Sequence, residues 1–107
     1  MIQICNLRNQ KLEFEYDIRV DRFNKILGNR FYMASELDRN LVCDKYQAWF
    51  DEQLKLKNEL VLNELRRLYR IYKQYGKLRL FCWCAPKRCH AETIKNFLDK
   101  YINKGVL

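Results

Sequence analysis

The hydrophobic residues follow two different spacings along the chain, and this change of spacing is the strongest constraint on the fold. Near the N-terminus, Ile2–Cys5 and Leu12–Val20 alternate apolar with polar residues, which is typical of half-buried strands. Leu78–Cys84 is a short, mostly apolar run that predicts a buried strand. The chain therefore supplies three candidate strands.

Helical spacing separates and follows these strands. The first helix is expected from about Ser35, with Ser35 or Asp38 as its cap, and the second from about Asn58 to Tyr75, with Gly76 as its stop. The last begins near Cys89. Their apolar faces are predicted to be Leu37, Leu41, Val42, Tyr46, Trp49 and Phe50; Leu62, Leu65, Leu68, Tyr69, Tyr72 and Tyr75; and Ala91, Ile94, Phe97, Leu98 and Tyr101. The pattern predicts a single α/β domain over residues 1–107, a short sheet flanked by amphipathic helices.

Composition excludes several classes of protein. A hydrophobic content of 49% is too high for a disordered tail, and no apolar run reaches the roughly 18 residues of a membrane-spanning helix. The N-terminal decapeptide is too polar for a signal peptide. Five cysteines, an odd number, favour reduced thiols and a cytoplasmic location.

Basic residues are concentrated in the second half of the chain. Residues 1–54 hold 8 Lys or Arg against 9 Asp or Glu, whereas residues 55–107 hold 13 against 4. This asymmetry favours an anionic partner, such as a nucleotide, a nucleic acid or an acidic protein, although a solvated basic face would show it too.

The segment Cys82–His90 has the highest density of potentially reactive or ligand-binding side chains. It holds three of the five cysteines, the only proline and the only histidine. A strand is expected to end near Cys84 and a helix to begin near Cys89, and ligands of open α/β sheets bind where strands end and helices begin. The free amides around Lys87–Ala91, with Lys87 and Arg88, would then favour a phosphate or carboxylate. Pro86 suits the first helical turn.

Three other interpretations of this segment remain open. Cys82, Cys84, Cys89 and His90 are suitable ligand types for zinc, although their spacing matches no recognised knuckle. A cysteine could be a nucleophile; Cys89 is favoured because a helix N-terminus beside Arg88 and His90 would lower its pKa. Finally, the cysteines could simply be small buried hydrophobic residues.

The stretch Leu80–Ile94 resembles the signature of domain of unknown function 4326, a family of small bacterial, archaeal and phage proteins. The resemblance extends over most of the chain. It includes Asn6-Leu7-Arg8, Asp21-Arg22, Gly28-Asn29-Arg30-Phe31, Arg39 and Tyr46-Gln-Ala-Trp49. Asp21 replaces a glycine of the family and Arg30 a proline, which could alter the wall of a pocket.

The resemblance implies a small Rossmann-like sheet and no established reaction. Polar residues shared across distant segments imply one convergent pocket, and several arginines there would suit phosphate. The expected ligand is a nucleotide or a nucleotide-derived phosphorylated molecule; at the level of the family, a phage-type protein could sequester a nucleotide signal of host defence. No metal or other cofactor is assigned. The expected ligand-binding residues are Asn6, Arg8, Arg22, Asn29, Arg39, Cys82, Cys84, Pro86, Lys87, Arg88, Cys89 and His90.

Two other functions remain open. A nucleotide-processing hydrolase or transferase would use the Cys/His loop. A nucleic-acid-binding module would use the basic face formed by Arg66, Arg67, Arg70 and Lys73, although the spacing of Tyr69 and Tyr72 fits the core better than stacking on bases. The exposed faces of the long helices could also support a homodimer.

Overall fold

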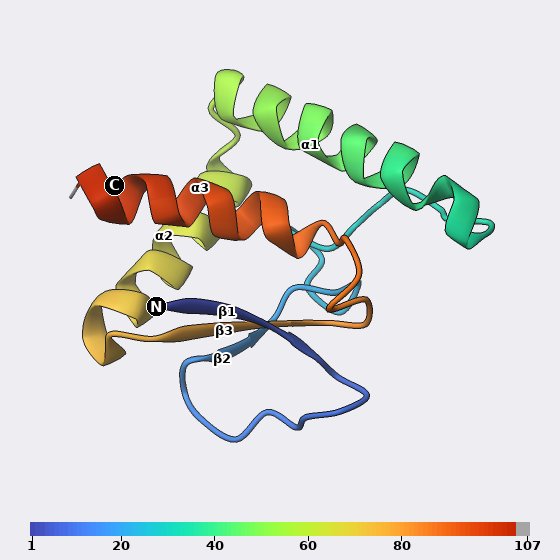
Figure 1. Cartoon of the computed structure of the whole chain (residues 1–107). Coiled ribbons are helices and arrows are strands. Elements are labelled where there is room, and N and C mark those ends of the chain that lie inside the picture. The colour runs from blue at the N-terminus through green and yellow to red at the C-terminus, as the bar shows by residue number, and fades with distance from the viewer. Residues whose placement is uncertain (105–107) are drawn as a thin grey trace.

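Three parallel strands form the centre of the protein (Figure 1). The computed structural model describes residues 1–104, so the last three residues of the expected 1–107 domain lie outside the described residues. The strands are β1 (Ile2–Asn6), β2 (Asp17–Arg19) and β3 (Leu78–Cys82), in the order β1-β3-β2. The last strand along the chain is therefore the middle strand of the sheet. The expected α/β fold with a small sheet is confirmed.

All three helices lie on the same side of the sheet (Figure 1). They are α1 (Arg39–Lys55), which follows the short 3-10 helix η1 (Glu36–Asp38), α2 (Glu59–Tyr75) and α3 (Ala91–Lys104). α2 and α3 pack on the sheet, and α1 packs on α2 and α3. On the other side of the sheet, the loop of residues 7–16 carries the chain from β1 to β2.

The main core lies between the sheet and the helices. Alternate side chains of β3 enter it, because successive residues of a strand point to opposite faces. The buried residues of β3, α2 and α3 in this cluster are Leu78, Leu80, Cys82, Val61, Leu65, Leu68, Ala91, Ile94 and Leu98. α1 adds Tyr46, whose hydroxyl donates a hydrogen bond of 2.6 Å to the carbonyl oxygen of Leu27. This bond ties the outer helix to the loop that follows β2.

The face of the sheet away from the helices carries a buried ion pair, which the loop of residues 7–16 covers. Arg79 of β3 binds Asp17 of β2 with an N–O distance of 2.6 Å, and the Asp17 side chain is fully buried. The guanidinium lies over the rings of Phe14 and Phe81, at 5.4 and 5.2 Å from their centroids. Phe14 also stacks on Tyr16. Loop 7–16 thus covers this face without a helix.

The expected strand over Leu12–Val20 is mostly wrong. Only Asp17–Arg19 pair with β3, and Leu12 and Phe14 are exposed. The amide of Asp17 donates to the carbonyl oxygen of Phe14, and the Asp17 carboxylate accepts from the amides of Glu13 and Phe14. These bonds make a turn where the alternating pattern predicted a strand. The expected strand Leu78–Cys84 likewise ends earlier, at Cys82, so Trp83 is half-exposed rather than buried.

The helix predictions are better, and they are best where local signals set the ends. Asn58 caps α2 by accepting a hydrogen bond from the amide of Leu60, and Gly76 ends it with a φ of 69°, in the left-handed region. At α1, neither Ser35 nor Asp38 makes a side-chain capping bond. Leu37 and Leu41, expected on its apolar face, are 95% and 55% exposed.

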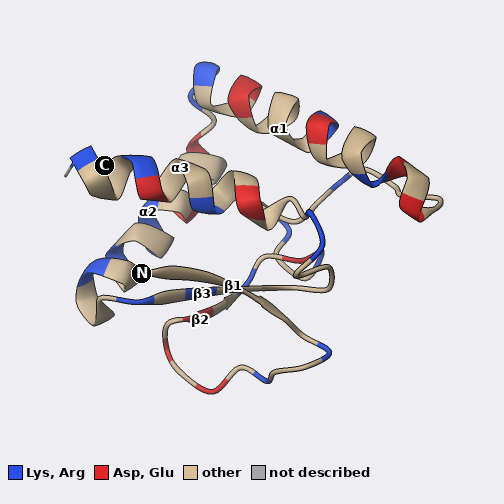
Figure 2. Cartoon of the chain, viewed as in Figure 1, with Lys and Arg blue, Asp and Glu red and all other residues tan. Residues whose placement is uncertain are grey.

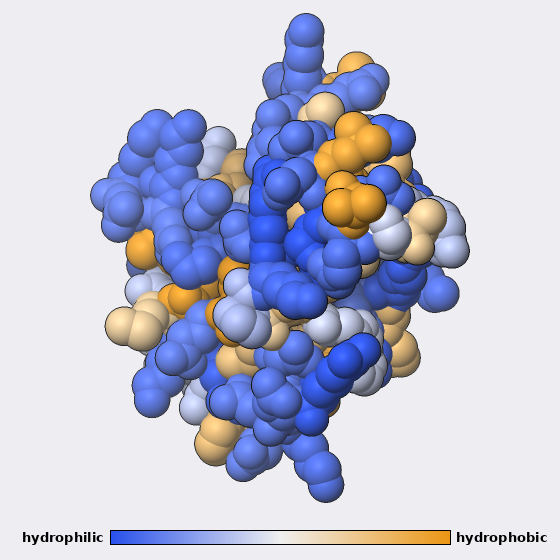
Figure 3. Space-filling view, turned by 45° about the vertical axis from the view of Figure 1, so that its right-hand side comes forward, coloured by the Kyte–Doolittle hydropathy of each residue, from blue (hydrophilic) through white to orange (hydrophobic). Residues whose placement is uncertain are grey.

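Charged and apolar residues are mixed over the surface. Acidic and basic residues alternate along α1 (Figure 2), and the face in Figure 3 is mostly hydrophilic with small hydrophobic groups. Among residues 1–104, no helix has both the length and the apolar character needed to cross a membrane.

Candidate functional site

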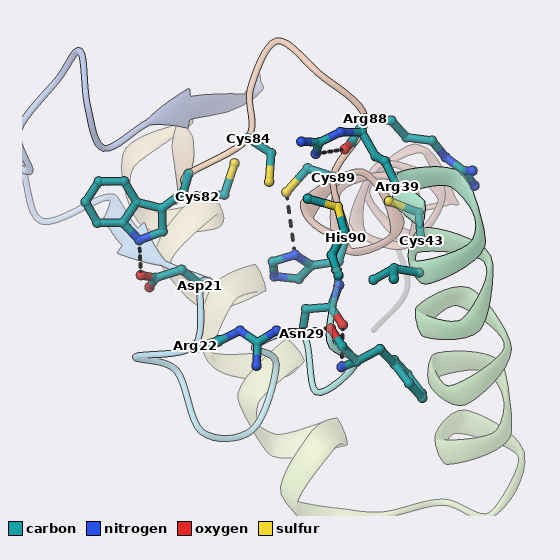
Figure 4. A pocket seen from close by; sticks show the side chains of 14 residues that line it. Asp21, Arg22, Asn29, Arg39, Cys43, Cys82, Cys84, Arg88, Cys89 and His90 are labelled. Atoms are coloured by element: carbon teal, nitrogen blue, oxygen red, sulfur yellow. Dashed lines mark hydrogen bonds between the residues drawn. The ribbon is translucent and has the colours of Figure 1, made fainter. Parts of the chain in front are cut away.

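A cavity of about 220 Å³ lies beyond the carboxyl ends of β2 and β3 (Figure 4). Its walls come from four places: the loop after β2, the loop after β3, the start of α3 and one side of α1. In parallel sheets the strands end at the same edge, which brings these loops together. Eight of the expected ligand-binding residues line it, namely Arg22, Asn29, Arg39, Cys82, Cys84, Arg88, Cys89 and His90.

The other four expected residues lie outside this cavity. The Asn6 side chain donates a 2.7 Å hydrogen bond to the carbonyl oxygen of Ala85, so it holds the loop after β3 rather than facing the cavity. Pro86 lies beside Asn6 in a separate depression. The ammonium of Lys87 is 3.5 Å from the Glu36 carboxylate, and Arg8 is exposed beyond the end of β1.

Six lining residues were not among the expected ligand-binding residues: Asp21, Phe31, Met33, Val42, Cys43 and Trp83. The substitution of the family glycine by Asp21 was the one available signal, and the structure gives it a role. Its carboxylate accepts a 2.8 Å hydrogen bond from the indole of Trp83 and two from Arg19. Burial raises the pKa of Asp21, but the bonds from Arg19 and Trp83 outweigh burial and lower it. Asp21 is therefore a charged anchor for the rim.

Three arginines meet at the cavity, and they differ in how much of their charge is already paired. Arg39 makes two hydrogen bonds to Glu36, and Arg88 binds Asp44 at 2.7 Å. Arg22 makes no ion pair within residues 1–104; its guanidinium donates to the carbonyl oxygen of Phe31 at 3.0 Å. Arg22 is the cation with most bonding capacity left for a ligand.

Two of the loop amides expected to bind an anion are instead bound within the protein. The amide of Lys87 donates to the carbonyl oxygen of Cys84, and that of Cys89 donates to the Glu92 carboxylate, which turns back as in a capping box. The expected phosphate cradle over Lys87–Ala91 is therefore partly filled by the protein itself.

The sulfur atoms of Cys82, Cys84 and Cys89, the sulfur cluster, point toward one another (Figure 4). The neighbouring Cys89 thiol lowers the pKa of Cys84 to about 5 against the opposing effect of burial, with Arg39 assisting. The same thiol lowers the pKa of Cys82 to about 7, helped by the amides of Cys84 and Ala85. The cluster thus holds negative charge on sulfur.

The expectation that the helix N-terminus lowers the pKa of Cys89 is wrong. The neighbouring Cys82 and Cys84 sulfurs, followed by burial, raise its pKa, so it keeps its proton. The helix N-terminus does not reverse this, because the two neighbouring sulfurs compete for the negative charge. Cys84 is the thiolate at neutral pH and is also the only partly exposed member of the cluster.

His90 is buried, and both of its ring nitrogens have contacts. Nε2 binds the carbonyl oxygen of Val20 and must therefore carry a proton, while Nδ1 is 3.5 Å from the Cys89 sulfur. Burial lowers the pKa of His90, which favours the neutral ring with a lone pair on Nδ1. Within residues 1–104, no group of three or more His, Cys, Asp or Glu side chains has an arrangement that could hold a metal ion. The zinc interpretation finds no support in this geometry.

The basic face of α2 lies away from the cavity. Arg67 binds Glu64 and Arg66 binds Asn63, while Tyr69 and Tyr72 are half-buried. These contacts use part of the charge that nucleic-acid binding would need, and that function stays a prediction.

Gly28 sets the position of the loop that carries Arg22 and Asn29. A Cβ atom there would lie 2.6 Å from the carbonyl oxygens of both Asp21 and Asn24. Gly28→Ala is therefore expected to lower the free energy of unfolding by about 1–3 kcal/mol, as overpacking does, when measured by urea denaturation. It should also shift the NMR signal of the Trp83 indole N–H, because Asp21 holds that group.

Gly76→Ala is the contrasting variant for this measurement. A Cβ atom at Gly76 meets nothing within 4 Å, and its cost, about 1 kcal/mol, comes only from the φ of 69°. It should leave the Trp83 signal in place. An unchanged signal in Gly28→Ala would contradict the close approach described here.

Fold and site together define a small α/β protein with a cavity at the carboxyl edge of a parallel sheet, lined by arginine, cysteine and histidine side chains. The chain belongs to the family described as domain of unknown function DUF4326, whose model matches residues 5–100. The matched region contains every residue that lines the cavity. No curated protein and no solved structure matches the chain.

Proposed function

We propose that the protein binds a nucleotide or a nucleotide-derived phosphorylated ligand in this cavity. The observation that carries the proposal is the meeting of three arginines from separate segments, Arg22, Arg39 and Arg88, in one cavity beyond the strand ends. Guanidinium groups suit phosphate because they donate paired hydrogen bonds. Arg22, which has no acidic partner within residues 1–104, is the proposed phosphate contact.

The rest of the cavity offers surfaces for a ring. Phe31, Met33 and Val42 supply apolar wall, and the half-exposed indole of Trp83 is fixed at the rim by Asp21. Ligand sites commonly combine an apolar lining with a few fixed polar groups. A base against the wall and a phosphate on Arg22 would satisfy both parts.

A thermal-shift measurement with nucleoside mono- and diphosphates and ADP-ribose tests the proposal. At about 100 times its Kd, a ligand should stabilise the protein by about 2.7 kcal/mol, a rise in Tm of roughly 10 °C for a domain of this size. Arg22→Ala should remove most of the shift, because a charge-assisted hydrogen bond is worth about 1.5–3 kcal/mol.

Arg8→Ala is the matched control for Arg22→Ala. Arg8 is exposed and does not line the cavity, so its variant should keep the full shift. If none of these ligands shifts the Tm, or if Arg22→Ala and Arg8→Ala behave alike, the proposed site is wrong.

The Cys84 thiolate favours one second candidate, a nucleotide-processing hydrolase or transferase. Cys84 lines the cavity beside Arg39 and is partly exposed, as a nucleophile must be. This function requires product formation that is lost in Cys84→Ser. Recovery of unchanged ligand after prolonged incubation would leave binding alone.

We propose that the protein acts in the cytoplasm. All five cysteines are free thiols, which suits a reducing compartment such as the cytoplasm. Sequestering a nucleotide signal of host defence, as a phage-type protein could, is the proposed role for binding without turnover.

A further inference from the structure

The sulfur cluster places one accessible sulfur beside two buried ones. Cys84 is partly exposed on the cavity wall, whereas Cys82 and Cys89 are only 1% and 3% exposed. Their side chains come from the end of β3, the loop after it and the residues before α3, and they point into the same space (Figure 4). A reagent that enters the cavity therefore meets Cys84 first.

The neighbours of Cys84 prepare it to react and place a second thiol next to it. Arg39 lies beside its sulfur and lowers its pKa, and the sulfur of Cys89 faces it across the cluster (Figure 4). All five cysteines are free, so the Cys84 and Cys89 thiols are both available. An accessible thiolate next to a buried thiol is the arrangement in which oxidation of the first sulfur leads to a disulfide with the second.

We propose that Cys84 and Cys89 form a peroxide-responsive thiol pair, with Cys84 as the attacking sulfur and Cys89 as the resolving sulfur. The Cys84 thiolate attacks one oxygen of hydrogen peroxide, the O–O bond breaks, and hydroxide leaves. Cys84 becomes a sulfenic acid, oxidised by two electrons, and the peroxide is reduced. The Cys89 sulfur then attacks the Cys84 sulfur, the S–S bond forms and the S–OH bond breaks.

His90 provides a place for the proton in the second step. The Nδ1 lone pair of His90 is 3.5 Å from the Cys89 sulfur and can accept the proton of this thiol. The bond from Nε2 to Val20 fixes the ring in this orientation. Nδ1 takes the Cys89 proton, and the departing hydroxide takes it up as water, so no proton is left over.

Cys43 provides a matched control because it lines the same cavity without sharing these features. It is buried on α1, and burial raises the pKa of its thiol. Cys89 is not among the groups that shift this pKa. Cys43→Ser should therefore leave the oxidation of the pair unchanged.

The test is oxidation of the reduced, full-length protein with hydrogen peroxide, followed by mass spectrometry of the intact protein and its peptides. The wild type should lose two hydrogen atoms, with Cys84 linked to Cys89, and a reductant should restore it. Cys89→Ala should stop at the sulfenic acid, trapped on Cys84 by dimedone. Cys84→Ser should slow oxidation at least about tenfold, because the remaining thiols are buried or less ionised.

Three results would overturn the proposal: a wild type that stays reduced while free cysteine in the same tube oxidises, a disulfide other than Cys84–Cys89, or a Cys84→Ser variant oxidised at the wild-type rate. Thermal melting of each variant shows whether it is folded. If a variant does not fold, the disulfide assignment in the wild type tests the proposal by itself. No nucleotide is present, so the result is independent of the proposed ligand.

Discussion

Iodoacetamide is expected to alkylate Cys84 nearly as fast at pH 6 as at pH 8. A thiol with a pKa of about 5 is a thiolate throughout this interval, and its rate should fall only as the pH drops below that value. An ordinary cysteine, with a pKa of about 8.5, loses roughly 80-fold in rate over the same interval because its thiolate fraction falls by that factor. Peptide mass spectrometry at a series of pH values gives the rate at each cysteine.

Cys89→Ala separates the effect of the neighbouring thiol from the other causes of this behaviour. Loss of Cys89 removes the largest effect that lowers the pKa of Cys84, so the alkylation rate at pH 6 should fall well below its pH 8 value. Cys43→Ala removes another buried thiol from the same cavity and should keep the flat profile. A Cys89→Ala profile as flat as the wild type would show that Cys89 does not stabilise the thiolate.

Asp17→Ala is expected to lower the free energy of unfolding by about 3 kcal/mol, measured by urea denaturation, because it leaves Arg79 charged and unpaired beneath the sheet. The lower part of the range for buried pairs applies, since the Arg79 side chain retains 16% exposure. The variant also removes the acceptor for the amides of Glu13 and Phe14, which hold loop 7–16.

The stabilisation from Asp17 should depend on pH in a defined direction. Burial raises the pKa of Asp17, but the hydrogen bonds from Arg79 and from the two amides outweigh it and lower the pKa below the unfolded value. The contribution of the charged form is therefore complete above about pH 4 and declines as the pH falls through the folded pKa. The difference between wild type and Asp17→Ala should shrink in acid.

Two variants define what the Asp17 result means. Asp17→Asn keeps the shape and part of the hydrogen bonding but not the charge, so its loss measures the ionic part. Asp51→Ala removes an exposed acid whose contact is one hydrogen bond from Gln47, and should change stability by less than about 0.5 kcal/mol. If Asp17→Ala were as mild as Asp51→Ala, the ion pair would not stabilise the fold.

The elements that the sequence predicted well are those with local causes. Helix α2 has an Asn58 cap and a Gly76 stop, and both act within a few residues of the helix end. The length of β2 depends instead on how much of it meets β3, some sixty positions later, and on a turn made by the side chain of Asp17. Alternation alone contained neither piece of information.

In the candidate site, too, residues with local sequence signals were predicted and residues placed by distant contacts were not. The loop Cys82–His90 is dense in chemistry, so its residues could be singled out directly, whereas Arg22, Asn29 and Arg39 were expected at one site because of the family resemblance. Val42 and Cys43 reach the cavity only because α1 crosses near the start of α3, where Arg39 bonds the carbonyl oxygen of Arg88. The loop amides were misassigned because acceptors within the protein, the carbonyl oxygen of Cys84 and the carboxylate of Glu92, take two of them.

The placement of the last strand between the first two determines when the sheet can exist. Within residues 1–104, neither β1 nor β2 has a neighbouring strand until Leu78–Cys82 has been synthesised, because each pairs only with β3. During translation the α1–α2 hairpin can form from local contacts, while the backbone groups of β1 and β2 remain without a strand partner. Any ribosome-stalled or truncated chain ending before Leu78 would present unpaired strand edges to chaperones instead of a partly built sheet.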